Sequence, residues 1–147
     1  MPIFPDYRLL LTSWTADAPE LRAVRHKVFV EEQQVPEELE WDDRDTQCLH
    51  LLAIDGTGKG IGTGRLLHEA QTGHIGRMAV LREWRGQGVG AAILDMLLAV
   101  AREHGLGEVV LNAQTHALGF YARRGFIAEG GEFQDAGIPH RRMRLRL

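Results

Sequence analysis

Residues 74–90 read HIGRMAVLREWRGQGVG. The first part, His74–Leu81, is rich in apolar residues and predicts a strand. The glycine-rich part, Arg85–Gly90, follows it, and apolar residues then recur every three or four positions, which predicts a helix over Gly88–His104. A glycine turn that opens a helix presents backbone N–H groups beside the positive end of the helix dipole. This turn therefore predicts a phosphate or diphosphate ligand.

The glycine turn also has other interpretations. A P-loop is excluded, because no Gly-Lys-Ser or Gly-Lys-Thr follows the glycines. Gly86, Gly88 and Ala91 satisfy the dinucleotide-binding pattern G-x-G-x-x-A. The next predicted strand, however, ends at Asn112 rather than at an acid suited to a ribose. A tight turn with a purely structural role remains as an alternative.

The segments on either side of this turn predict a mixed sheet. Glu108–Asn112 reads as a short buried strand, so strand, helix and strand form a βαβ crossover in which His74–Leu81 and Glu108–Asn112 are parallel. Upstream, Leu49–Ile54 and Gly60–Leu67 flank an Asp-Gly and a Thr-Gly pair and predict a hairpin. With His74–Leu81 they make an antiparallel meander.

The outer segments complete one α+β domain. No linker rich in Pro, Gly or Ser divides the chain, so residues 1–147 are interpreted as a single domain. Apolar residues at helical spacing predict a helix that begins at Pro19 and stops near Pro36. The other predicted elements are a strand at Tyr7–Ser13, a short helix at His116–Arg124, and a final hairpin of Phe126–Phe133 and His140–Leu147.

Composition argues against several classes of protein. Apolar residues make up 44% and charged residues 25% of the chain, which is typical of a globular domain. The single cysteine, Cys48, cannot form an internal disulfide, so a reducing cytoplasm is the expected location. Residues 1–6 lack the pattern of a secretory signal, and no apolar run approaches a membrane helix. The net charge of −3 argues against a nucleic-acid partner, and the histidines show no metal-site spacing.

Charge is distributed unevenly along the chain. Residues 31–45 hold eight acids and one base, Arg44, for a net charge of −7, which leaves +4 for the rest. A cationic substrate near this segment and an anionic cofactor elsewhere would suit the division. A solvated acidic surface explains the same charges without any ligand.

Over residues 20–147 the sequence resembles the GNAT superfamily of N-acetyltransferases. The resemblance is carried by the signature Q/R-x-x-G-x-G/A at Arg85, Gly88 and Gly90, by a pantetheine-holding strand at Arg77–Val80, and by an Ala-(Phe-Tyr)-Gly-Phe segment at Ala117–Phe126. A narrower similarity, to the ElaA-like branch, lies in Arg25–Gln33 and in Gly137–His140 with Met143. The resemblance implies a three-layer α/β arrangement with a mixed, mostly antiparallel sheet, whose central parallel pair splays to form an acyl-CoA cleft.

The resemblance also implies an activity. We expect an N-acetyltransferase that moves the acetyl group of acetyl-CoA to a primary amine of a small molecule or peptide by direct attack in a ternary complex. The acidic segment makes a cationic acceptor one expectation. The alternative is a catalytically inactive module that binds acyl-CoA as a sensor or partner subunit. No metal, nucleic acid or membrane is expected to take part, and a homodimer is a candidate assembly.

Several residues acquire cofactor-binding roles through the resemblance. Backbone amides of the glycine turn would hold the diphosphate of coenzyme A, and the strand before it would pair with the pantetheine arm. The expected contacts are Met78, Ala79, Val80, Arg85, Gly86, Gln87, Gly88, Val89, Gly90, Asn112, Phe120 and Tyr121.

The catalytic roles rest on the same resemblance. Tyr121 matches the family's tyrosine acid, and the N–H of Val80 would stabilise the oxyanion. His74 occupies the position where related enzymes carry a glutamate base, and His140 and Glu32 are the alternative bases. A tyrosine in the core and a histidine in an exposed turn are the structural alternatives.

Overall fold

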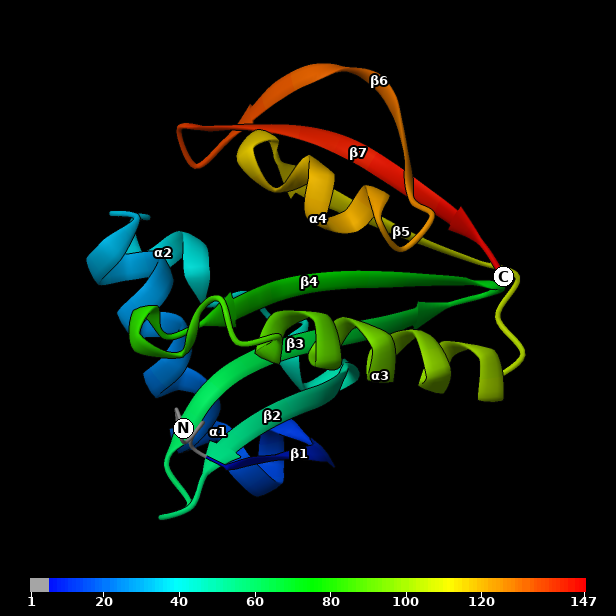
Figure 1. The fold of residues 1–147 in the computed structure, drawn as a ribbon. Coiled ribbons are helices and arrows are strands. Elements are labelled where there is room, and N and C mark those ends of the chain that lie inside the picture. The colour runs from blue at the N-terminus through cyan, green and yellow to red at the C-terminus, as the bar shows by residue number, and fades with distance from the viewer. Residues whose placement is uncertain (1–5) are drawn as a thin grey trace.

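A seven-stranded mixed sheet forms the centre of the computed structural model, which describes residues 6–147 (Figure 1). The strand order is β1-β2-β3-β4-β5-β7-β6, and every neighbouring pair is antiparallel except β4–β5. This confirms the predicted α+β class. The strands are β1 (Tyr7–Thr12), β2 (Leu49–Asp55), β3 (Gly60–Glu69), β4 (Thr72–Val80), β5 (Glu108–Gln114), β6 (Ile127–Asp135) and β7 (Ile138–Arg146).

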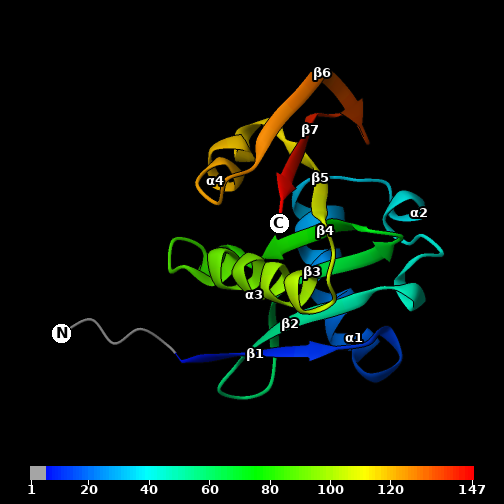
Figure 2. The same ribbon diagram turned by 90° about the vertical axis from the view of Figure 1, so that its right-hand side faces the viewer.

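Helices cover both faces of the sheet. Figures 1 and 2 show α3 and α4 on one face, while α1 lies on the opposite face of β2 to β4. No helix within residues 6–147 is long and apolar enough to cross a membrane. The helices are α1 (Trp14–Arg25), the π-helix η1 (His26–Glu32), α2 (Glu37–Glu40), α3 (Val89–Glu103) and α4 (Leu118–Ala122), with 3₁₀ turns η2 (Asp45–Gln47), η3 (Arg82–Trp84) and η4 (Thr115–Ala117).

The first helix begins earlier than predicted. Ser13 caps α1, and its side chain accepts a hydrogen bond from the N–H of Ala16, so the helix starts at Trp14 rather than at Pro19. Asp17 interrupts the helix with φ −133° and ψ 26°. Pro19 therefore stands in the first turn after an interruption, where its missing N–H leaves no hydrogen bond broken. The residues 1–5 used to argue against a secretory signal lie outside the described residues.

The helix α3 packs closely on β3 because glycines line the contact. A Cβ atom at Gly62 would lie 2.9 Å from Ile93 Cδ1, and one at Gly64 would lie 2.8 Å from Leu97 Cδ1. Both distances are too short for a real contact, so only glycine permits this approach. Ile93 and Leu97 are fully buried beneath it. The predicted helix Gly88–His104 is thereby confirmed as the helix that packs on the sheet.

The parallel pair β4–β5 is short. Its register contains only Thr72 with Glu108, Gly73 with Val109, and His74 with Val110. Beyond these pairs β4 continues beside β3 and β5 continues beside β7, so the two strands diverge. The predicted splay of the central parallel pair is therefore confirmed.

A bulge in β4 lies within the diverging segment. Thr63 pairs with Ala79 but Arg65 pairs with Gly76, so β4 contains one residue more than β3 over this stretch. Arg77 has a positive φ of 53° there. Bulges bend a strand and increase its local twist. This bulge accompanies the separation of β4 from β5.

Candidate functional site

A cleft of about 960 Å³ occupies the space between the diverging strands. Its floor and walls combine β4, β5, η1, α4 and the start of β7. Eight of the twelve residues predicted to bind the cofactor line this cleft: they are Met78, Ala79, Val80, Arg85, Gly90, Asn112, Phe120 and Tyr121. The other four, Gly86, Gln87, Gly88 and Val89, belong to the glycine turn and are not among its lining residues. Since β4 has no ladder partner on this side beyond His74, its backbone edge faces the cleft.

The glycine turn leads directly into α3 near this cleft. Gly86 and Gly88 have φ values of 76° and 84°, which side chains other than glycine rarely adopt. A Cβ atom at either position would meet nothing within 4 Å, so the turn faces open space. No side chain caps the first turn of α3. Its N–H groups are therefore available to an anion, and the turn fits a diphosphate.

Arg85, at the start of the turn, already has protein partners. Its two terminal nitrogens donate to the carboxylate of Glu32 at 2.6 and 3.0 Å, and Nε donates to the carbonyl of Val80 at 2.9 Å. The hydrogen bonds from Arg85 lower the pKa of Glu32. Glu32, a predicted base, and Arg85, a residue predicted to bind phosphate, are thus paired with each other.

Residues 16–147 match the family model described as an acetyltransferase (GNAT) domain. The chain belongs to the GNAT acetyltransferase family. It is 40% identical to YjcF, an uncharacterized N-acetyltransferase of Bacillus subtilis, over 82% of this chain and 86% of that protein.

Solved GNAT-like structures share the whole fold. The chain is similar to an acyl-CoA N-acyltransferase from Pseudomonas aeruginosa, with 30% identity and a TM-score of 0.85 over 95% of this chain and 99% of that chain. It is also similar to Escherichia coli ElaA, with 27% identity and a TM-score of 0.82 over 96% and 99% of the two chains. The predicted resemblance to GNAT proteins, including ElaA, is confirmed.

Tyr121 lies in an apolar environment at the wall of the GNAT cleft. Its ring makes edge contacts with Phe120 and Phe126 at centroid distances of 5.0 and 5.9 Å. Burial raises the pKa of Tyr121 to about 12. Its hydroxyl forms no hydrogen bond with another residue in the described chain. The hydroxyl is therefore protonated at neutral pH and open to a ligand in the cleft.

Two of the predicted bases, Glu32 and His140, line the cleft, and Glu32 is paired with Arg85. The other is His140. The ring is buried, stacks on Phe133 at 5.9 Å, and places Nδ1 2.6 Å from the carbonyl oxygen of Ile138. A carbonyl only accepts hydrogen bonds, so in the neutral ring Nδ1 carries the proton and Nε2 keeps a lone pair. This tautomer is the one that a general base needs.

His74 lies elsewhere. It belongs to the closed end of the β4–β5 pair, opposite Val110, and its Nε2 is 3.6 Å from a carboxylate oxygen of Glu69. It is not among the residues that line the cleft. The position of His74 in the family motif predicted it as the general base. At His74, however, β4 is still paired with β5, so this residue lies outside the cleft.

A polar bridge across the cleft was not predicted from the sequence. Gln33, which follows η1, and Gln114, at the end of β5, exchange hydrogen bonds between their side-chain amides at 2.9 and 3.3 Å. His116 Nε2 lies 2.6 Å from the same Gln114 amide oxygen. The glutamines are 81 positions apart, so no local pattern could have paired them.

The acidic segment is largely neutralised by arginines. Arg25 is almost fully buried and donates to Glu40 and Asp45, each at 2.7 Å. Its guanidinium carbon lies 5.2 Å from the ring centroids of both Trp14 and Trp41. These contacts fix the segment after α2 against α1.

Two further arginines complete the network beside the cleft. Arg65 donates to Asp42 at 2.7 and 2.9 Å and to Asp45 at 2.9 Å. Arg77, in the β4 bulge, has Nε 3.1 Å from a carboxylate oxygen of Glu40. Burial alone would raise the pKa of Asp42, but the hydrogen bonds and charge of Arg65, the backbone N–H of Arg44 and the charge of Arg77 together outweigh burial and lower that pKa to about 2. The interpretation as a solvated surface therefore holds only for part of the segment: Glu31, Glu37, Glu38 and Asp43 are exposed.

Proposed function

We propose that this chain is an N-acetyltransferase that transfers the acetyl group of acetyl-CoA to a primary amine of a small molecule or peptide, with both substrates bound at once. One observation carries the proposal. The cleft between the separated strands β4 and β5 lies close to an uncapped glycine turn, and Tyr121 and His140 both line that cleft.

The chain's own groups supply the binding sites. The edge of β4 at Met78–Val80 would pair with the amides of the pantetheine arm as an added strand. The amides of Gly86–Gly90 would hold the diphosphate, and Arg85 would add a charge-assisted contact. Asn112 and Phe120 would contact the arm from the opposite wall.

His140 and Val80 would assist the attack. Nε2 of His140 accepts a proton from the amine as the amine nitrogen forms its bond to the acetyl carbonyl carbon. The N–H of Val80 stabilises the negative charge that gathers on the carbonyl oxygen. The bond from carbon to sulfur then breaks, and coenzyme A leaves as a thiolate.

Tyr121 would act on the departing sulfur. An ordinary thiol has a pKa of about 8.5, so a phenol with a pKa of about 12 is too weak an acid to give its proton up to the thiolate completely. Tyr121 therefore stabilises the thiolate by donating a hydrogen bond. The proton that the amine gives to His140 balances the one that the sulfur finally gains.

Two measurements test the proposal. Calorimetry with acetyl-CoA measures binding, and release of free thiol measures transfer over a panel of primary amines. We expect binding, and thiol release that depends on the amine. Failure to bind acetyl-CoA would overturn the proposal, whereas binding without amine-dependent release from any acceptor would favour the inactive acyl-CoA-binding module.

A further inference from the structure

Arg85 connects the glycine turn, in which it lies, to η1 and to β4. It contacts Glu32 at the end of η1 through both terminal nitrogens, and it contacts the Val80 carbonyl of β4 through Nε. All three nitrogens of the guanidinium are engaged by these contacts. Arg85 nevertheless remains 40% exposed, so an incoming anion can reach it.

A diphosphate on the glycine turn would compete for the same guanidinium. Arg85 is the residue immediately before Gly86, and the forked guanidinium binds one carboxylate or one phosphate at a time in bidentate geometry. The pair with Glu32 is partly exposed, so solvent and salt screen its attraction. A doubly charged diphosphate is therefore able to displace it.

The position of Glu32 does not depend on Arg85 alone. The next residue, Gln33, is held by the reciprocal hydrogen bonds to Gln114 across the cleft. Arg82 is the other cation near Glu32, but it is 3.7 Å away and 76% exposed, so it binds the carboxylate weakly. After Arg85 leaves, the Glu32 carboxylate would stay on the cleft wall.

We propose that Glu32 is a specificity-determining residue that exchanges partners during the reaction. The diphosphate of the bound cofactor takes Arg85, and the released Glu32 carboxylate then attracts the acceptor in its ammonium form, which loses one proton to solvent before the neutral amine attacks the thioester. The cofactor thus completes the acceptor site. This inference rests on the proposed acetyl-CoA-dependent activity.

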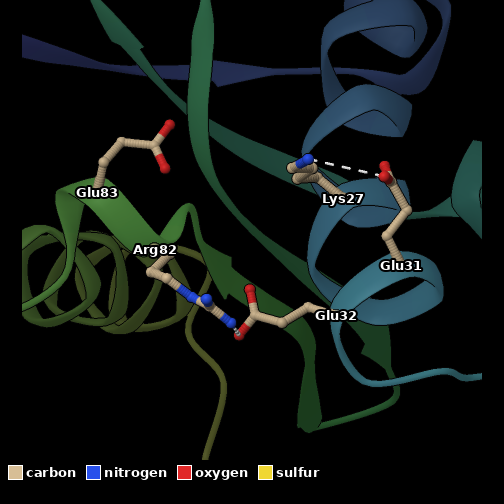
Figure 3. A pocket seen from close by; sticks show the side chains of 5 residues that line it. All are labelled: Lys27, Glu31, Glu32, Arg82 and Glu83. Atoms are coloured by element: carbon tan, nitrogen blue, oxygen red, sulfur yellow. Dashed lines mark ion pairs between the residues drawn. The ribbon is translucent and has the colours of Figure 1, made fainter.

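The first test is the affinity for coenzyme A, measured by calorimetry. Glu32→Gln removes the competing carboxylate, so the Kd should fall by roughly two- to fivefold, which corresponds to the free energy of an exposed pair. Glu31→Gln is the matched control, because it removes the same charge one residue away. Figure 3 shows that Glu31 faces Lys27, 3.6 Å away, whereas Glu32 faces Arg82.

A double-mutant cycle shows whether the effect passes through Arg85. In an Arg85→Gln background, Glu32→Gln should change the Kd by less than it does in the wild type. The inference is overturned if Glu32→Gln weakens binding, matches Glu31→Gln, or has its full effect without Arg85. Absence of coenzyme A binding by the wild-type chain is a different result, and it overturns the proposed function itself.

The second test uses an amine that the wild-type chain acetylates. Glu32→Gln should raise the KM for the amine while it lowers the KM for acetyl-CoA. A purely structural role would weaken both substrates together, so parallel changes would contradict the exchange. Thermal unfolding of each variant confirms that the chain remains folded.

Discussion

Tyr121 offers the clearest test at the scale of single residues. Tyr121→Phe keeps the aromatic contacts with Phe120 and Phe126 but removes the hydroxyl. We expect kcat to fall about 10²-fold, because one donor to developing charge is lost. The Kd for acetyl-CoA should change by less than about twofold. Equal losses in kcat and in affinity would mean that Tyr121 only shapes the cleft.

The two histidines make a matched pair of variants. His140→Gln should lower kcat/KM for the amine by roughly 10²-fold, since it removes the lone pair that accepts the proton. His74→Gln should leave kcat/KM within about twofold, because His74 does not line the cleft. Steady-state kinetics with both variants decide between them. A larger loss of kcat/KM in His74→Gln than in His140→Gln would mean that His74 is the general base, as the motif predicted.

At the scale of elements, the contact of α3 with β3 depends on glycine. A Cβ atom at Gly64 would lie within 2.9 Å of Ile93, Leu97 and Met78, so Gly64→Ala should destabilise the chain by about 1–3 kcal/mol. Urea unfolding measures this change in the free energy of unfolding. Gly76→Ala is the control, because its Cβ would approach nothing closer than 3.9 Å. Equal stability of the two variants would mean that α3 moves away from the sheet without cost.

At the scale of the whole molecule, the arginine network joins α1, β3 and β4 to the segment after α2. The pKa of Asp42 is lowered to about 2 in the folded state from an ordinary value of 3.8. Its stabilising contribution is therefore fully present above about pH 4 and is lost as the pH falls towards 2. By about pH 3 the loss amounts to about 1 kcal/mol.

Asp42→Asn tests this coupling. The variant should lose less stability than the wild type between about pH 6 and pH 3, because the residue no longer titrates. Urea unfolding at a series of pH values gives the two curves. Parallel curves would show that Arg65 does not hold the Asp42 carboxylate in its charged form. The pKa of Glu40 is shifted in the opposite direction, because burial raises it. Glu40 is present in both the wild type and the variant, so it does not account for a difference between the two curves.

Local sequence was sufficient for the central elements of this protein. Helical spacing predicted α3, and the cluster of glycines predicted the turn before it. Gly86 and Gly88 of that turn have positive φ in the structure. Both elements depend only on neighbours within a few residues. The predicted start of α1 at Pro19 was wrong. Ser13 was not recognised as the N-cap, and the helix was not expected to be interrupted at Asp17. The hairpin β6–β7 was expected, though its strands are longer than predicted.

Long-range packing settled the identity of the groups in the cleft. Arg85 meets Glu32 from 53 positions away, and His140 rather than His74 lines the cleft because β4 separates from β5 only after His74. Helix and turn preferences arise from short-range sterics and hydrogen bonds within one segment of chain. Partner choice among charged side chains depends instead on strand order and on where two strands part, which no short stretch of sequence encodes.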